Sequence, residues 1–109
     1  MRCAAVLGFV LSLFGAAESI GAGLPKFPGD TPYQEARRSL IALGYKPASL
    51  PGADKCNKGD GRCFPEVESC AGTGLGQCIY TWRRGETLIE VFTVNERPIV
   101  QAVRCRINC

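Results

Sequence analysis

Six cysteines in the second half of this chain constrain its fold more than any other feature: Cys56, Cys63, Cys70, Cys78, Cys105 and Cys109. The seventh, Cys3, precedes an apolar N-terminal run, and we exclude it from pairing. An even number of cysteines in a short exported chain is typical of a disulfide framework formed in an oxidising compartment. The sequence therefore predicts three structural disulfides.

The N-terminus has the features of a secretory signal peptide over residues 1–17. Arg2 supplies a positive charge, and the run from Ala4 to Ala17 is apolar and uncharged. Gly15 and Ala17 are small residues at the −3 and −1 positions of a cleavage site, and a second candidate cleavage position follows Gly23. The run of 14 residues is shorter than the roughly 20 that a membrane-spanning helix needs, which disfavours an uncleaved anchor. We expect a secreted or periplasmic protein without a membrane span after cleavage.

Residues 18–29 contain glycine and proline without periodicity, which predicts a flexible lead-in to a single domain over 30–109. The domain begins with a predicted helix. Thr31 is the expected N-cap, with Pro32 at the first helical position and Gln34 completing a capping box. Gly44 is expected to end this helix. Apolar residues repeat along it at helical spacing at Tyr33, Ala36, Leu40 and Leu43.

The segment from Lys46 to Gly76 has no helical or strand period and holds three of the cysteines. A loop of this length is unusual in a compact domain, and disulfides offer a physical explanation because each restricts the unfolded chain. We therefore expect a long loop tethered by disulfides.

Three β-prone runs follow, Gln77–Arg83, Thr87–Val94 and Ile99–Arg106, separated by turn-like breaks. With Arg84-Gly85 and Glu96-Arg97 as two-residue turns, alternation predicts an apolar face made of Cys78, Tyr80, Trp82, Ile89, Val91, Val100 and Ala102. The other face then carries Ile79, Leu88, Phe92, Val94, Ile99 and Val103 with Thr81, Glu90 and Gln101. The predicted fold class is α+β, with one N-terminal helix packed on a three-stranded antiparallel meander.

The second face of this meander is more apolar than a solvated sheet face should be. We expect the cysteine-rich loop to fold across it; the alternative is that part of it meets a partner protein. The best candidates for partner contact are Trp82, Arg83 and Arg84, because a tryptophan beside arginines at a hairpin tip resembles an interface hot spot. Core packing is the competing interpretation for Trp82.

Little in the sequence indicates catalysis or cofactor binding. The chain has no histidine, which excludes Ser-His-Asp and Cys-His mechanisms. A hydrolase with two carboxylates is the remaining enzymatic alternative, with candidate acids at Asp54, Asp60, Glu66 and Glu68. The cysteine spacing does not fit a zinc module, and we expect no metal or cofactor. The charge of the cleaved chain is close to neutral, at +2, and lacks a basic stripe, which disfavours nucleic-acid binding.

Two motifs carry a resemblance to known proteins. They are Tyr33-x-x-Ala36-Arg37-x-x-Leu40-Ile41-x-x-Gly44-Tyr45-x-Pro47 and Pro65-Glu66-x3-Cys70-x-Gly72-Thr73-Gly74-x3-Cys78. The chain resembles a group of small secreted, cysteine-containing proteobacterial proteins of uncharacterised function. Its helix-then-meander order is also similar to one repeat of β-lactamase-inhibitory proteins and to outer-membrane assembly lipoproteins. The resemblance implies no established activity.

The predicted meander also limits which cysteines pair. Cys78 begins the first strand and Cys105 ends the third, so they should lie about 20 Å apart, too far for a disulfide. We expect Cys70 to pair with Cys78. Cys56 and Cys63 are then expected to join Cys105 and Cys109, and the alternative is the local pairs Cys56–Cys63 and Cys105–Cys109.

Together these observations predict an exported, non-catalytic binding protein, with inhibition of a secreted or envelope enzyme as one form of that role. A structural or assembly component of the cell envelope is the first alternative, and the carboxylate hydrolase is the second.

Overall fold

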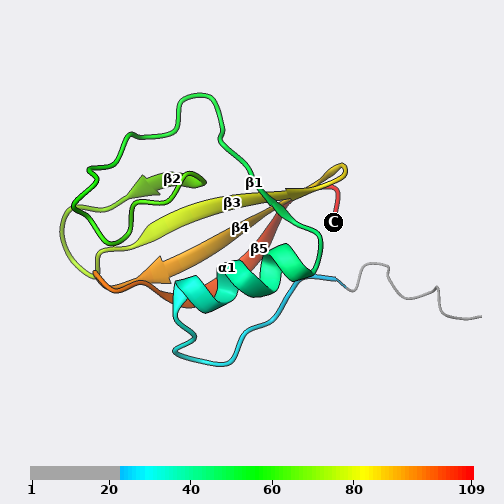
Figure 1. The fold of residues 1–109 in the computed structure, drawn as a ribbon, viewed down its shortest axis with the longest axis horizontal. Helices are drawn as coiled ribbons and strands as arrows, with labels where there is room; N and C mark the ends of the chain where they lie inside the picture. The colour runs from blue at the N-terminus through cyan, green and yellow to red at the C-terminus, as the bar shows by residue number, and fades with distance from the viewer. Residues whose placement is uncertain (1–22) are drawn as a thin grey trace, which may run out of the picture.

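The computed structural model describes residues 23–109 (Figure 1). The predicted signal peptide, 1–17, and the first part of the lead-in lie outside the described residues. The described chain forms α1 (Tyr33–Ala42), β1 (Lys46–Pro47), β2 (Val67–Cys70), β3 (Cys78–Arg84), β4 (Thr87–Val94) and β5 (Ile99–Ile107). Within residues 23–109, no helix has the length and apolar character needed to cross a membrane.

The strands form one antiparallel sheet in the order β1-β3-β4-β5, with β2 also paired to β3. The predicted fold class is therefore wrong: the sheet has five strands rather than three, and the fold is mostly β. Both unexpected strands come from the segment that we expected to be a loop. They have only two and four residues, too few to show alternation, and they form because the edge of β3 offers them backbone partners.

Helix α1 lies across one face of the sheet (Figure 1). Its predicted capping box is wrong, since Pro32 is the N-cap and the Thr31 hydroxyl donates to the Pro28 carbonyl at 2.6 Å. The helix start is held by the sheet instead, because the Tyr33 N–H donates to the Pro98 carbonyl at 2.9 Å. Gly44, with φ of 92°, follows the last turn and ends the helix as expected.

The turn between β3 and β4 is Gly85-Glu86, so Arg84 pairs with Thr87 and Trp82 with Ile89. The turn lies one residue later than expected. This changes the pairing by two residues and leaves every β3 and β4 side chain on its predicted face. Gly85 has φ of 58°, a conformation that glycine adopts at little cost.

Strand β5 departs further from expectation because its pairing with β4 shifts at two bulges. After the first bulge, Ala102 pairs with Phe92 and Val103 with Val91. The extra residue exchanges the two faces, so Val103 packs against the core and Ala102 does not, the reverse of the prediction.

The core lies between α1 and the near face of the sheet. Its fully buried side chains include Tyr33, Leu40, Tyr80, Trp82, Ile89 and Val91. Leu24 and Phe27, in the described part of the lead-in, pack against this core. The lead-in therefore contributes to the folded domain from at least Leu24 onward.

The disulfides join Cys56 to Cys63, Cys70 to Cys78 and Cys105 to Cys109. The Cys70–Cys78 pair matches the preferred pairing, and the two cysteines are direct partners in the β2–β3 ladder. The preferred link from Cys56 and Cys63 to the C-terminus is wrong, and the local alternative is found. The long segment is held to the sheet by β1 and β2, so it needs no distant disulfide. Three disulfides fit a chain exported to an oxidising compartment.

Candidate functional site

A buried ion pair connects α1 to the residue that precedes β2. The Glu66 carboxylate is fully buried and accepts hydrogen bonds from the Tyr33 hydroxyl at 2.6 Å and from Arg37 Nε at 2.7 Å. Arg37 Nη2 binds the other carboxylate oxygen at 3.1 Å. The Trp82 indole N–H donates to the Tyr33 hydroxyl at 2.9 Å. We call these four residues the Glu66 cluster.

The Glu66 cluster has the properties of a structural element. Burial, together with the neighbouring Glu66 charge, raises the pKa of Tyr33 well above its usual range. The hydrogen bonds to Glu66 raise the pKa of Arg37, whose guanidinium also lies 4.8 Å from the centre of the Phe64 ring. Trp82 is fully buried, so it is not available to touch a partner.

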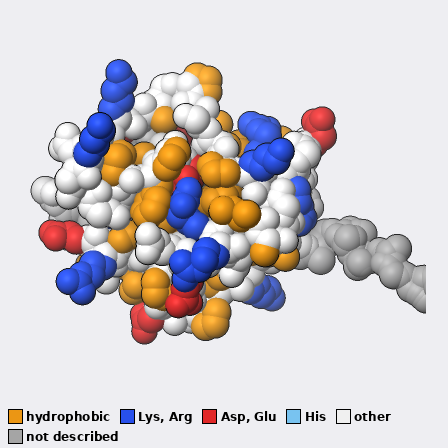
Figure 2. Space-filling view, viewed as in Figure 1, with side chains coloured by type: hydrophobic (Ala, Val, Ile, Leu, Met, Phe, Trp, Pro, Cys, Tyr) orange, Lys and Arg blue, Asp and Glu red, His pale blue; other side chains and the backbone are white. Residues whose placement is uncertain are grey.

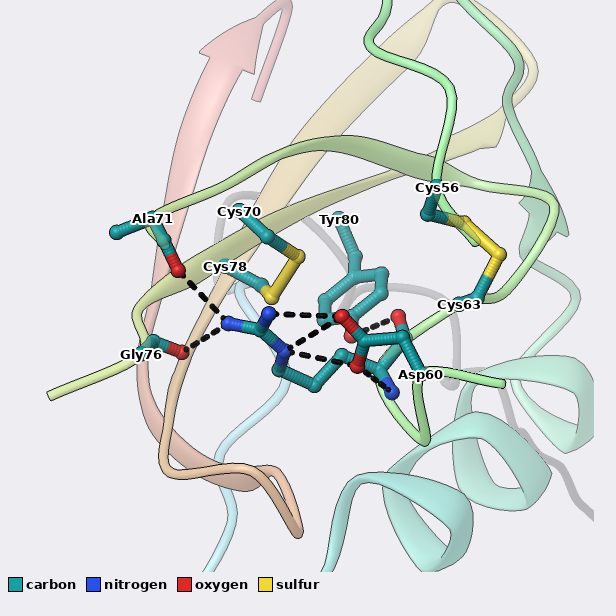
Figure 3. Close-up of polar contacts among 9 residues, drawn as sticks. Cys56, Asp60, Cys63, Cys70, Ala71, Gly76, Cys78 and Tyr80 are labelled. Atoms are coloured by element: carbon teal, nitrogen blue, oxygen red, sulfur yellow. Dashed lines mark hydrogen bonds and ion pairs between the residues drawn. A yellow bond between two sulfur atoms is a disulfide. The ribbon is translucent and has the colours of Figure 1, made fainter. Parts of the chain in front are cut away.

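A second polar cluster organises the cysteine-rich segment (Figure 3). The Arg62 guanidinium binds both carboxylate oxygens of Asp60, with a shortest distance of 2.7 Å, and donates to the carbonyls of Ala71 at 2.9 Å and Gly76 at 3.3 Å. The Tyr80 hydroxyl donates to the Arg62 carbonyl at 2.6 Å. Figure 3 shows the Cys56–Cys63 and Cys70–Cys78 disulfides close to these groups. We call this the Arg62 cluster.

Three of the four candidate acids are each held by a different arginine. Asp60 is bound by Arg62, Glu66 by Arg37 and Glu68 by Arg106. Hydrogen bonds from Arg62 lower the pKa of Asp60 to about 2, and those from Arg106 lower the pKa of Glu68. A general acid needs a pKa raised toward the working pH, so these environments are those of structural ion pairs. Within residues 23–109, no three potential metal ligands gather into a cluster.

The sheet face opposite α1, which we call the outer face, is only partly covered. At one end Thr81 and Leu88 are buried, and the Thr81 hydroxyl donates to the Ala48 carbonyl at 2.9 Å. At the other end Ile79 and Phe92 are only half-buried. They border an open groove of about 410 Å³, which is also lined by Ser69, Cys70, Ala71, Gln77, Thr93 and Gln101.

Basic side chains on the outer face outnumber the acidic ones available to them. Lys46 of β1 lies directly opposite Arg83 of β3, and both are exposed. The Arg104 guanidinium lies 4.8 Å from the centre of the Phe92 ring. Arg106 engages both acids of this face, Glu68 at 2.6 Å and Glu90 at 3.0 Å. Within residues 23–109, Lys46, Arg83 and Arg104 have no carboxylate within 4.0 Å.

The predicted contact residues do not form one site. Arg83 is on the outer face, whereas Arg84 lies on the helix side, where it donates to the Leu43 carbonyl at 3.0 Å and stacks on Tyr45. On the helix side, basic side chains gather near the end of the β3–β4 hairpin (Figure 2). Of the predicted trio, Arg83 alone remains in the candidate surface.

Sequence reasoning did not identify Lys46 or Arg104 as part of this surface. Lys46 lies opposite Arg83 because it belongs to β1. A strand of two residues is too short to show alternation in the sequence. Arg104 reaches the outer face because a bulge shifts β5 by one residue. A bulge is set by tertiary pairing, so neither position could be read from local pattern.

We compared the chain with protein-family models, curated proteins and solved structures, and none of them matches it.

Proposed function

We propose that this chain is an exported, non-catalytic binding protein whose outer face binds an acidic partner protein. The observation that carries the proposal is the direct opposition of Lys46 and Arg83 across the β1–β3 ladder, with no carboxylate within 4.0 Å of either among residues 23–109. Like charges in this arrangement destabilise a sheet. A partner carboxylate placed between them relieves this repulsion on binding.

Two neighbouring features support the same role. Arg104 offers a third cation, and its position over the Phe92 ring holds the guanidinium at the surface. The groove beside Ile79 and Phe92 provides an apolar pocket of about 410 Å³ for a partner side chain. An apolar anchor site near basic groups is typical of interfaces that combine burial with charge steering.

The test is capture from culture medium and from envelope extracts with immobilised protein. The double variant Lys46→Glu/Arg83→Glu reverses both charges but keeps a like-charge pair, so the stability of the sheet should change little. The matched control, Arg38→Glu/Lys58→Glu, changes net charge equally at two exposed sites away from this pair. We expect one soluble acidic protein to be recovered by wild type and control, in a salt-sensitive manner, and lost with the double variant.

Other outcomes would select the alternatives. Recovery of outer-membrane or cell-wall material would favour a structural envelope role, and inhibition assays on a captured enzyme would show whether binding inhibits it. Equal capture by the double variant and wild type would contradict the outer-face proposal. Hydrolysis that is lost in Glu66→Gln/Glu68→Gln, with the fold retained, would overturn the non-catalytic assignment.

A further inference from the structure

Strand β5 is an edge strand of the sheet, and among residues 23–109 most of its free edge has no backbone hydrogen-bond partner. The Val100 N–H donates outward to the Thr31 carbonyl at 2.8 Å. Beyond that point, within the described chain, residues 102–107 pair with β4 alone and make no backbone hydrogen bond on the outer side. Unpaired N–H and C=O groups along an edge strand are a template for another strand.

Neighbouring segments leave this edge open. The lead-in passes beside Val100–Val103, but no backbone hydrogen bond joins residues 23–27 to β5, and residues of both segments line an open cleft of about 360 Å³. At the other end the C-terminal tail turns toward β4, where the Thr87 hydroxyl donates to the Asn108 carbonyl at 2.8 Å. Within residues 23–109, this edge is therefore bordered at both ends rather than covered.

The charge of β5 indicates which kind of strand can pair with its free edge. The strand contains Arg104 and Arg106 and no acidic residue. Arg106 is already paired with Glu68 and Glu90, whereas Arg104 has no carboxylate within 4.0 Å among residues 23–109. A second copy of β5 would bring like charges to this edge, which disfavours pairing between two copies.

We propose that an extended acidic segment of a partner protein pairs with β5 and extends the sheet. Backbone hydrogen bonds to β5 supply affinity, and a carboxylate at an alternate position of the segment faces Arg104. This inference rests on the proposed binding function and adds to it the extended conformation of the bound segment and its place at the β5 edge.

The test uses a capped synthetic peptide of alternating Glu and Val, titrated into the exported protein with its disulfides intact. Amide hydrogen exchange measured by NMR should show slower exchange of β5 amides beyond Val100 at saturating peptide. The same peptide N-methylated at every residue has no backbone N–H donors on either edge and should not bind. Arg104→Glu should weaken binding by about tenfold, whereas Arg38→Glu, on the exposed side of α1, should leave it unchanged.

Three results would overturn the inference. They are unchanged exchange of β5 amides at millimolar peptide, equal binding of the N-methylated peptide, and slow exchange in a peptide-free dimer, which would identify a second copy as the occupant. If capture by the outer face still depends on Lys46 and Arg83 while this test fails, the binding function stands and strand addition does not.

Discussion

The two sides of the sheet hold charged side chains in different environments. On the helix side, Glu66 is fully buried and its carboxylate is bound by Tyr33 and Arg37 at 2.6–3.1 Å. On the outer face, Lys46 and Arg83 are exposed, directly opposed, and without a carboxylate within 4.0 Å in residues 23–109. A buried charge must be paired for the chain to fold, whereas an exposed one can remain unpaired because water solvates it. The first arrangement supports the fold, and the second remains available for a partner.

The largest expected effect is on the helix side. Glu66→Ala leaves Arg37 and the Tyr33 hydroxyl without their buried partner, so the free energy of unfolding should fall by about 3 kcal/mol or more. Glu68→Ala is the matched control, because its pair with Arg106 is partly exposed and should contribute about 1 kcal/mol or less. Denaturant unfolding measures both. Similar losses would contradict the contrast between the two sides.

Removal of the Tyr33 hydroxyl is a milder perturbation of the Glu66 cluster. Tyr33→Phe removes a donor to Glu66 and an acceptor for Trp82, and we expect a loss of about 1–3 kcal/mol. Tyr45→Phe is the comparison, since among the described residues the Tyr45 hydroxyl makes no hydrogen bond and its loss should change stability little. Equal melting temperatures for the two variants would argue that the Glu66 cluster contributes no net stability.

On the outer face the sign of the effect should reverse. Lys46→Glu converts a like-charge pair into an opposite-charge pair with Arg83 and should stabilise the protein by up to about 1 kcal/mol. The same change should weaken capture of the acidic partner. Lys58→Glu, in the exposed part of the cysteine-rich segment, should do neither. Destabilisation by Lys46→Glu in denaturant unfolding would show that the pair is not repulsive.

The smallest effect concerns the pH dependence of the Arg62 cluster. The pKa of Asp60 is lowered to about 2 from an ordinary value of 3.8, so its ion pair contributes stability above about pH 4 and loses it as the pH falls toward 2. Asp60→Asn should lower the melting temperature slightly at neutral pH. The difference from wild type should shrink between pH 4 and pH 2. A constant difference over that range would contradict the role of the Asp60 charge.

Some parts of this structure follow from local pattern and others do not. The helical spacing identifies Tyr33, Ala36 and Leu40 as the buried face of α1, although Leu43, predicted on the same face, lies past the last helical residue and is exposed. Alternation identifies Tyr80 and Trp82 as core residues. Those signals depend only on the period of each element.

The remaining features are set by contacts between distant segments. β1 and β2 exist because β3 has a free edge, and the two bulges in β5 adjust its pairing with β4. The positions of the outer-face cations depend on the short edge strands and on the bulges: Lys46 belongs to β1, and Arg104 reaches this face because of a bulge in β5. The sequence indicated Arg83 as a contact residue, but it could not show which side chains would lie beside it.

The loop between β1 and β2 has a consequence for engineering this protein. Pro47 pairs with Trp82 and Val67 pairs with Tyr80, so the chain leaves the sheet and returns to it at positions two residues apart on β3, about 7 Å. The ends of this loop are fixed close together by β3, and lengthening the loop costs little free energy. The exposed turn at Pro51-Gly52 is therefore a suitable place to insert a peptide tag or a small domain without changing the register of the sheet.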